Sequence, residues 1–272
     1  MDAAQDDSDS LTKSRRVFYI AICHIKHKTG EDMAKIEWEK IDNTALVRMV
    51  NNKNRMDMTF AQEMLIIFEQ VLADESVTSM ILTSDDAKFF SMGVHVDWLE
   101  DRLRENDTDS VKNFLFGMQD VFKQILLMPI PVIAAINGHA YGNGSIICGA
   151  CDFRFMRSDK GYFCFPEVDL NIPFLPSMFL WLQRAIPHPL FNSMALSGRP
   201  VTAPELAKYA VIEKACKDSS ELMEEALGFA KTFDKGRKIF GELKKRMNQH
   251  IVTVMETQDR PLLESLSLFA KD

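Results

Sequence analysis

The chain has 272 residues, of which 46% are hydrophobic and 26% are charged, and its formal net charge is −7. These values are typical of a soluble globular protein with one large domain, with or without an appendage. The acidic balance argues against a protein that binds nucleic acid or a membrane surface, because both partners require basic surfaces. It leaves room for a local basic patch that binds an anionic cofactor tail.

Several features of the sequence bear on the compartment. No apolar run approaches the length of a membrane-spanning helix. The acidic N-terminus is unlike a secretory signal, and residues 268–272 are unlike a peroxisomal address. The five cysteines stand in apolar contexts, which favours reduced thiols. Cys148-x-x-Cys151 lacks a second pair, so we prefer buried packing to a redox or zinc site. Together these features predict a cytoplasmic protein without a metal site.

Apolar periodicity predicts the elements of the first half of the chain. Residues 1–15 are polar and are expected to be disordered. Thr59 is the expected N-cap of a helix, with Gln62 three residues further on. The predicted elements are a short strand or ordered arm at 17–25, strands at 36–41 and 44–50, a helix at 60–73, a strand at 77–83, a short helix at 98–103, a helix at 110–127 and a strand at 132–136.

The second half is predicted to be mainly helical. His188, between two prolines, is expected in a loop. The chain thus divides into the disordered tail, a core over residues 16–200 and a helical C-terminal region over residues 201–272. The predicted elements are helices at 145–151, 177–186 and 191–196, a helix that begins with a capped turn at 202–205, a strand at 211–213, and charged helices at 221–233 and 236–257.

A basic cluster in the last helices stands out in an acidic chain. A solvated helix face explains it most simply, and contact with a cofactor phosphate or with a neighbouring subunit is the alternative. The cluster consists of Lys235, Arg237, Lys238, Lys244, Lys245 and Arg246.

The stretch from Pro131 to Pro176 carries the clearest chemical signal. Residues 132–136 predict a buried strand, Asn137-Gly138 ends it, and Gly142-Asn143-Gly144 leads into a short helix. The N–H groups of a helix's first turn lack intrahelical partners and can stabilise an oxyanion, and glycine lets the backbone approach a ligand. Glycines that serve only helix–strand packing would give the same pattern.

Glu167 is a lone carboxylate in an apolar segment. Apolar surroundings disfavour the charged form of a carboxyl group and raise its pKa toward the range useful for a general base. The alternative is a solvent-facing glutamate on an alternating strand. The residues that follow suggest a bulky apolar pocket wall; they are Phe174, Leu175, Met178 and Phe179.

Four segments resemble the crotonase superfamily of enoyl-CoA hydratases and isomerases. They are Lys88–Val94, Asn137–Gly144, Cys151–Arg154 and Phe165–Leu170, and the resemblance extends in matching order over residues 36–215. Residues 156–163 and 172–176 look most like the Δ3,Δ2-enoyl-CoA isomerases. The resemblance implies an α/β fold, a spiral of ββα units with a helical C-terminal region. It also implies a homotrimer or dimer of trimers, with the C-terminal helices at the subunit contacts.

The resemblance also assigns roles to residues. The amides of Val94 and Asn143 would form an oxyanion hole for the thioester oxygen; the alternative for the first turn is that Gly93 is a simple loop glycine. Asn143 stands where the family usually has glycine or another small residue, so its side chain would crowd the pocket or add a donor. Glu167 matches the second of the two glutamates that hydratases use to hold a water, while Ile146 replaces the first. The implied substrate contacts are Ser91, Gly93, Gly142, Gly144, Ile146 and Phe174.

One base without a water partner suits proton shuttling better than hydration. We therefore expect an isomerase that converts 3-enoyl-CoA to 2-trans-enoyl-CoA, in which Glu167 moves the proton from C2 to C4. No cofactor is expected, since CoA belongs to the substrate. Two alternatives remain: another crotonase-type hydratase or hydrolase, and a non-catalytic member that only binds acyl-CoA.

Overall fold

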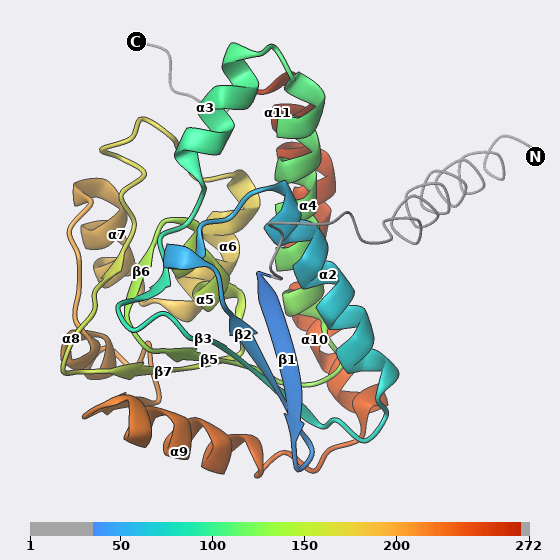
Figure 1. Ribbon diagram of the computed structural model, residues 1–272, viewed down its shortest axis with the longest axis vertical. Helices are drawn as coiled ribbons and strands as arrows, with labels where there is room; N and C mark the ends of the chain where they lie inside the picture. Colours follow the sequence, from blue (N-terminus) through green and yellow to red (C-terminus); the bar gives the residue numbers. More distant parts are fainter. Residues whose placement is uncertain (1–34, 268–272) are drawn as a thin grey trace, which may run out of the picture. The chain divides into compact units, whose positions relative to one another are not determined.

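A six-stranded sheet forms the frame of the computed structural model, which describes residues 35–267 (Figure 1). The tail predicted at 1–15 and the strand predicted at 17–25 lie outside the described residues. The strand order is β1-β2-β3-β5-β7-β9, with β1 antiparallel to β2 and the others parallel. Its strands are β1 Ile36–Ile41, β2 Thr44–Met49, β3 Ser79–Ser84, β5 Val132–Ile136, β7 Phe153–Arg157 and β9 Lys214–Cys216.

A second, smaller sheet stands beside the first and has the order β4-β6-β8, with all its strands parallel. Its strands are β4 Phe89–Ser91, β6 His139–Tyr141 and β8 Phe163–Cys164. Each follows directly on a strand of the large sheet, as β4 follows β3, β6 follows β5 and β8 follows β7, and helices come next. After a first β1-β2-α2 unit, the described chain therefore repeats three times a unit of one large-sheet strand, one small-sheet strand and a helix, which confirms the predicted α/β spiral of ββα units.

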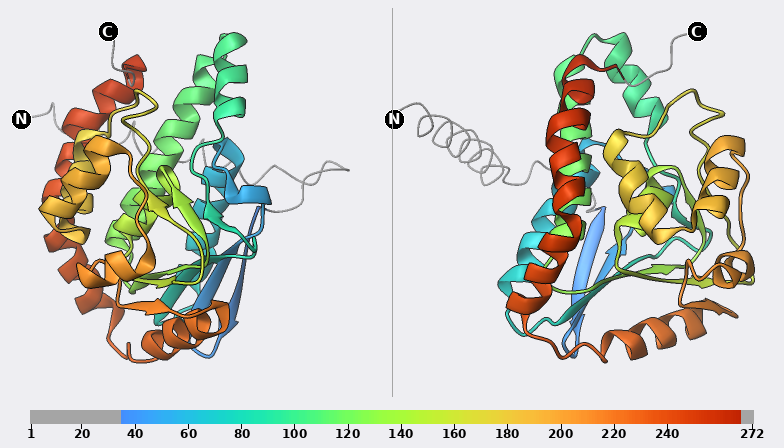
Figure 2. Two further views of the ribbon diagram at one scale, coloured as in Figure 1. Left: turned by 90° about the vertical axis from the view of Figure 1, so that its left-hand side faces the viewer. Right: turned by 180° about the vertical axis from the view of Figure 1, so that it is seen from behind.

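Helices cover both faces of the large sheet, as expected for parallel strands rich in Val, Ile, Leu and Met. On one face α2 Met58–Ala73, α4 Thr108–Leu127 and α10 Arg237–Val254 pack side by side, and α9 Ser219–Ala230 lies across the other (Figures 1 and 2). Alternate strand residues point to the two sides: Leu46, Ile81 and Ile133 face α9, whereas their neighbours join the larger core. The remaining helices are α3 Val96–Arg104, α5 Asn143–Ala150, α6 Pro176–Ala185, α7 His188–Ser197, α8 Ala203–Lys208 and α11 Arg260–Ser265.

Three local predictions were wrong. Asp57, not Thr59, caps α2, because its Oδ1 accepts a hydrogen bond of 3.0 Å from the Phe60 amide. His188 begins α7 rather than lying in a loop; the flanking prolines fall where a helix needs no intrahelical N–H. The last strand covers Lys214–Cys216 rather than 211–213. Val211 and Ile212 are buried just after α8, and their apolar, β-branched side chains gave this segment the sequence pattern of a buried strand.

The C-terminal helical region also differs from the prediction of one helix over 236–257. The helix α10 ends at Val254, a π-helical turn covers Met255–Asp259, and α11 follows. No helix in the described part of the chain is long and apolar enough to cross a membrane. The four cysteines among residues 35–267 are buried and free, Cys148 and Cys151 included.

Two members of the basic cluster hold α10 against the core. Lys244 is 3% exposed, and its Nζ lies 2.7 Å from Asp152 Oδ2 and 2.8 Å from the Ile125 carbonyl oxygen. Arg237 donates to the carbonyl oxygens of Leu72 and Val77 at 2.8 and 2.7 Å. These two cations are therefore not part of a solvated face or a phosphate site, whereas the other four residues of the cluster are exposed.

Replacing Lys244 with Met should lower the free energy of unfolding by up to about 3 kcal/mol, because the Asp152 carboxylate, whose side chain is only 19% exposed, would lose its cation. Urea unfolding followed by circular dichroism measures this. The exposed neighbour provides a matched control, since Lys245→Met should change the stability by less than about 0.5 kcal/mol. Equal losses in the two variants would show that the Lys244–Asp152 pair contributes nothing specific.

Candidate active site

The small sheet gathers three turns at one edge. The strands β4, β6 and β8 are parallel, so the residues that follow their carboxyl ends meet on the same side. Val94, Asn143 and Glu167 each come two or three residues after the end of one of these strands. Ligand sites in sheets with parallel strands commonly form beyond such carboxyl ends.

Val94 and Asn143 present free backbone amides in this region. The neighbours of Val94 hold its turn: the Met56 amide donates to the Gly93 carbonyl oxygen, and the His95 amide donates to the Met56 carbonyl oxygen, both at 2.8 Å. Asn143 is the first residue of α5. Neither the Val94 nor the Asn143 N–H donates to another residue of the described chain. Both residues line the same cavity, so their amides can serve one ligand atom.

Glycines allow these two turns to approach each other. Gly93 has φ +76°, and a Cβ there would lie 2.7 Å from the Tyr141 carbonyl oxygen and 3.0 Å from the Asn143 nitrogen. A Cβ on Gly144 would lie 2.5 Å from the Ser91 carbonyl oxygen. Ser91 is fully buried, and its Oγ accepts from the Gly93 amide at 3.1 Å and donates to the Asn54 carbonyl oxygen at 2.7 Å. Ser91, Gly93 and Gly144 therefore shape the turns without lining the cavity.

Glu167 occupies a tight turn after β8, not an alternating strand. The turn is closed by the Asp169 amide, which donates to the Pro166 carbonyl oxygen at 3.0 Å. Phe165, fully buried, and Phe174 pack edge-to-face with ring centroids 5.4 Å apart, and they anchor the two sides of the turn.

The Glu167 carboxyl group is largely desolvated. Its Oε2 is buried and has no hydrogen-bond partner among the described residues. Its Oε1 lies 3.4 Å from the position that a Cβ on Gly142 would occupy, which places the carboxyl against the glycine turn. Burial raises the pKa of Glu167 from its ordinary value of 4.5 to about 7. Such a group can both accept and release a proton near neutral pH.

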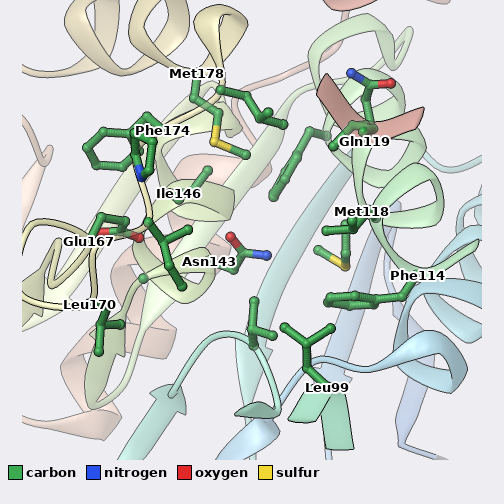
Figure 3. A pocket seen from close by; sticks show the side chains of 18 of the residues that line it. Leu99, Phe114, Met118, Gln119, Asn143, Ile146, Glu167, Leu170, Phe174 and Met178 are labelled. Atoms are coloured by element: carbon green, nitrogen blue, oxygen red, sulfur yellow. The ribbon is translucent and has the colours of Figure 1, made fainter. Parts of the chain in front are cut away.

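The cavity has a volume of about 420 Å³, within the usual range for small-molecule sites. Glu167 and Leu170 lie on one side of it, Phe114 and Met118 lie on the other, and Asn143 is between them (Figure 3). Gly142, Ile146 and Phe174 also line it, as do Leu175 and Met178. Ile146 is 2% exposed and offers no polar atom. Phe179 does not line the cavity; it is 38% exposed, and its ring packs edge-to-face on that of Phe174 with centroids 5.4 Å apart.

The cavity wall opposite Glu167 could not be predicted from the sequence. It comes from α3, α4 and the end of the C-terminal helices, and it includes Leu99, Phe114, Met118, Gln119, Asp259 and Leu263. The apolar members belong to helix faces that were predicted only as core. Within residues 35–267, no group of three His, Cys, Asp or Glu side chains is arranged as a metal site would require. His24 and His27 stand near each other in the sequence but lack further metal ligands that can be placed, and both lie outside the described residues.

The sequence profile of the enoyl-CoA hydratase/isomerase family matches residues 39–266. The chain belongs to this family. Its fold agrees, since a solved enoyl-CoA hydratase from Bacillus halodurans superposes with a TM-score of 0.77 at 20% identity. That match covers 87% of this chain and 96% of the hydratase.

Relatives within the crotonase family include several isomerases. Enoyl-CoA delta isomerase 2, peroxisomal, of Arabidopsis thaliana is 30% identical over 58% of this chain and 66% of its own length. The human mitochondrial Delta(3,5)-Delta(2,4)-dienoyl-CoA isomerase is 25% identical over 81% of this chain and 67% of its own length. The chain thus spans about two thirds of the length of these relatives.

Proposed function

We propose that this protein is an enoyl-CoA isomerase that converts a 3-enoyl-CoA thioester to the 2-trans-enoyl-CoA. The observation that carries the proposal is the Glu167 carboxyl group: its buried Oε2 has no hydrogen-bond partner among the described residues, and it shares an apolar cavity with two amide N–H groups that donate to no described residue. Ile146 supports isomerisation over hydration, because an apolar side chain cannot hold a water where a hydratase would have its first glutamate.

The proposed reaction needs only proton transfers. The thioester oxygen accepts hydrogen bonds from the Val94 and Asn143 amides, which makes the C2 protons more acidic. Glu167 takes one C2 proton, and the electron pair of that C–H bond forms the enolate, whose negative charge rests on the oxygen. The dienolate then collapses: the carbonyl reforms, the C2–C3 double bond forms, and the electrons of the old C3–C4 double bond take the proton back at C4. Glu167 ends as it began, and the reaction requires no separate cofactor.

Oligomeric state and compartment belong to the proposal as well. We infer a homotrimer or a dimer of trimers from the family resemblance, and a cytoplasmic location from the composition. The names of two relatives place those proteins in the peroxisome and in the mitochondrion instead. Microscopy of the tagged protein would test the cytoplasmic location.

Incubation with a 3-enoyl-CoA in D2O tests the proposed reaction. The expected result is 2-trans-enoyl-CoA, with deuterium incorporation detected by mass spectrometry and NMR. Formation of 3-hydroxyacyl-CoA would instead identify a hydratase, and release of free CoA would identify a hydrolase. Binding without exchange or conversion would indicate a non-catalytic acyl-CoA-binding protein.

The pH dependence of kcat/KM should report the Glu167 carboxyl group. The carboxylate is the active base, and burial raises its pKa to about 7. We therefore expect kcat/KM to rise about tenfold per pH unit below pH 7, to reach half its maximum near pH 7 and to level off above it. Initial rates between pH 5 and 9 measure this. A profile that is flat from pH 5 upward would mean that another group takes the proton.

A further inference from the structure

The side chain of Asn143 lies in the cavity, next to the backbone amide that the proposed reaction uses. Asn143 lines the cavity, and Figure 3 shows its carboxamide between Glu167 on one side and Phe114 and Met118 on the other. The carboxamide forms no hydrogen bond with a described residue. Unlike Glu167 Oε2, neither its oxygen nor its nitrogen is buried, so a ligand can reach both. A polar group without a protein partner therefore stands in a mainly apolar cavity.

Helix geometry places this carboxamide close to the oxyanion position. Asn143 is the first residue of α5 and follows the N-cap residue, Gly142. The N–H groups of a first helical turn point out of the N-terminal end of the helix, and each Cα–Cβ bond is tilted toward the same end. The backbone N–H and the side chain of Asn143 thus extend in the same general direction. Because an asparagine side chain is short, one ligand oxygen can accept hydrogen bonds from both.

The charge of the reaction intermediate determines which end of the carboxamide a ligand uses. Since no described residue holds the Asn143 carboxamide, rotation about its last side-chain bond can turn either end toward a ligand atom. An enolate oxygen is an anion, so it attracts the NH2 end and repels the carbonyl end. A neutral thioester oxygen accepts the same hydrogen bond more weakly, because hydrogen bonds to charged groups are stronger. The side chain would therefore stabilise the intermediate more than the bound substrate.

We propose that the side chain of Asn143 is a third hydrogen-bond donor to the enolate oxygen, in addition to the backbone amides of Val94 and Asn143. The proposal rests on the proposed function, because it takes the thioester oxygen to lie at the start of α5. The other carboxamide of the lining, that of Gln119, is on the opposite wall, where its NH2 group donates to Asp259 Oδ2 at 3.3 Å. It is therefore not a competing donor.

The ionisation of a bound 3-oxoacyl-CoA measures this hydrogen bond without turnover. The C2 proton of such a thioester is acidic, and its loss gives an enolate that absorbs in the near ultraviolet. The titration is made in the full-length Glu167→Gln protein, so that the Glu167 carboxyl group does not titrate together with the ligand. Asn143→Leu keeps the bulk of the side chain and the backbone N–H but removes the NH2 group. In this second variant we expect the pKa of bound 3-oxooctanoyl-CoA to rise by about 1 to 2.

Steady-state kinetics tests whether the donor serves the thioester oxygen, because a 3-oxoacyl-CoA has a second anionic oxygen. With Glu167 intact, Asn143→Leu should lower kcat for 3-enoyl-CoA isomerisation by about 10- to 100-fold and change KM by no more than a few-fold. Asn113→Leu makes the same change at an exposed position of α4 that does not line the cavity. This control should keep the wild-type kcat and the ligand pKa of the parent protein.

The outcomes separate this proposal from the proposed function. An unaltered ligand pKa in Asn143→Leu would overturn the third donor and leave the side chain as a group that only fills space. A raised ligand pKa with full isomerase kcat would also overturn it, because the NH2 group would then serve the 3-oxo oxygen. A raised ligand pKa in a protein whose wild type shows no isomerase turnover would overturn only the isomerase. Failure of both thioesters to bind would overturn both proposals. Asn143→Ala removes the same donor and gives the same test if the Leu variant does not fold.

Discussion

Replacing Glu167 with Gln should reduce kcat for 3-enoyl-CoA isomerisation by about 1000-fold. The amide has the shape of the carboxyl group but cannot take the C2 proton, and no other described carboxyl oxygen lies within 4 Å of the position that a Cβ on Gly142 would occupy. The loss should appear in kcat, while the affinity for a saturated acyl-CoA stays within a few-fold. Steady-state rates of 2-enoyl-CoA formation, together with calorimetric binding, measure the two quantities.

An exposed glutamate on α9 provides the control for this substitution. Glu224→Gln makes the same chemical change far from the cavity and should leave the rate unaltered. Full turnover by the Glu167→Gln variant would contradict the single-base mechanism, regardless of the rate measured for Glu224→Gln.

The same variant should also be more stable at neutral pH. The folded pKa of Glu167 is about 7 against an ordinary 4.5, so between these values the folded chain binds the proton more strongly than the unfolded chain. The contribution of this group to stability is therefore lost as pH rises from about 4.5 to 7 and stays lost above that window. The Gln variant has no such loss, and its advantage should grow over the window to at most about 3 kcal/mol. Urea unfolding at pH 5 and pH 8 measures this difference.

Replacing Gly93 with Ala should lower kcat/KM by about 100- to 1000-fold, because it would displace the two amides that we propose bind the enolate oxygen. The added Cβ would lie 2.7 Å from the Tyr141 carbonyl oxygen and 3.0 Å from the Asn143 nitrogen, so backbone would have to move. The φ of +76° also disfavours any residue with a Cβ. Steady-state kinetics measures the loss, and thermal unfolding shows how much of the variant is folded.

A control substitution at a second glycine distinguishes a specific loss of catalysis from a general effect of adding a Cβ. Gly228 lies inside α9, and a Cβ there would meet nothing within 4 Å. Gly228→Ala should keep full activity and gain about 0.5–1 kcal/mol of stability. If folded Gly93→Ala retained most of the wild-type kcat/KM, the Val94 amide would not be an essential donor.

The part of the site that contains Asn143 and Glu167 could be predicted because the sequence patterns that mark it lie close together along the chain. The strand β5, the glycine turn and the start of α5 follow one another along the chain, so composition alone marks the turn at Asn143. Glu167 was marked by its apolar neighbours. The strands β4, β6 and β8 escaped prediction because two or three residues are too few to show a period.

The opposite wall could not be predicted from local patterns. Gln119 lies on α4 among apolar residues that have the spacing of an ordinary core face. Asp259 meets Ser177 and Gln119 only after the C-terminal helices have packed on α4 and α6. The π-helical turn left no mark on the sequence periodicity, so the predicted continuous helix ended at residue 257, inside that turn, and α11 was not predicted.

That π-helical turn is also a point at which the helix can lose one residue without breaking. A π turn accommodates an extra residue inside a helix while the flanking α-helical segments keep their facing. A deletion of one codon within Met255–Asp259 would convert the π turn to an α-helical one. The Asp259 carboxyl group would then move away from the Ser177 amide at the start of α6, while α10 and α11 stay packed on α4. The lining of this cavity would therefore change in a single genetic step that leaves Glu167, Val94 and Asn143 untouched.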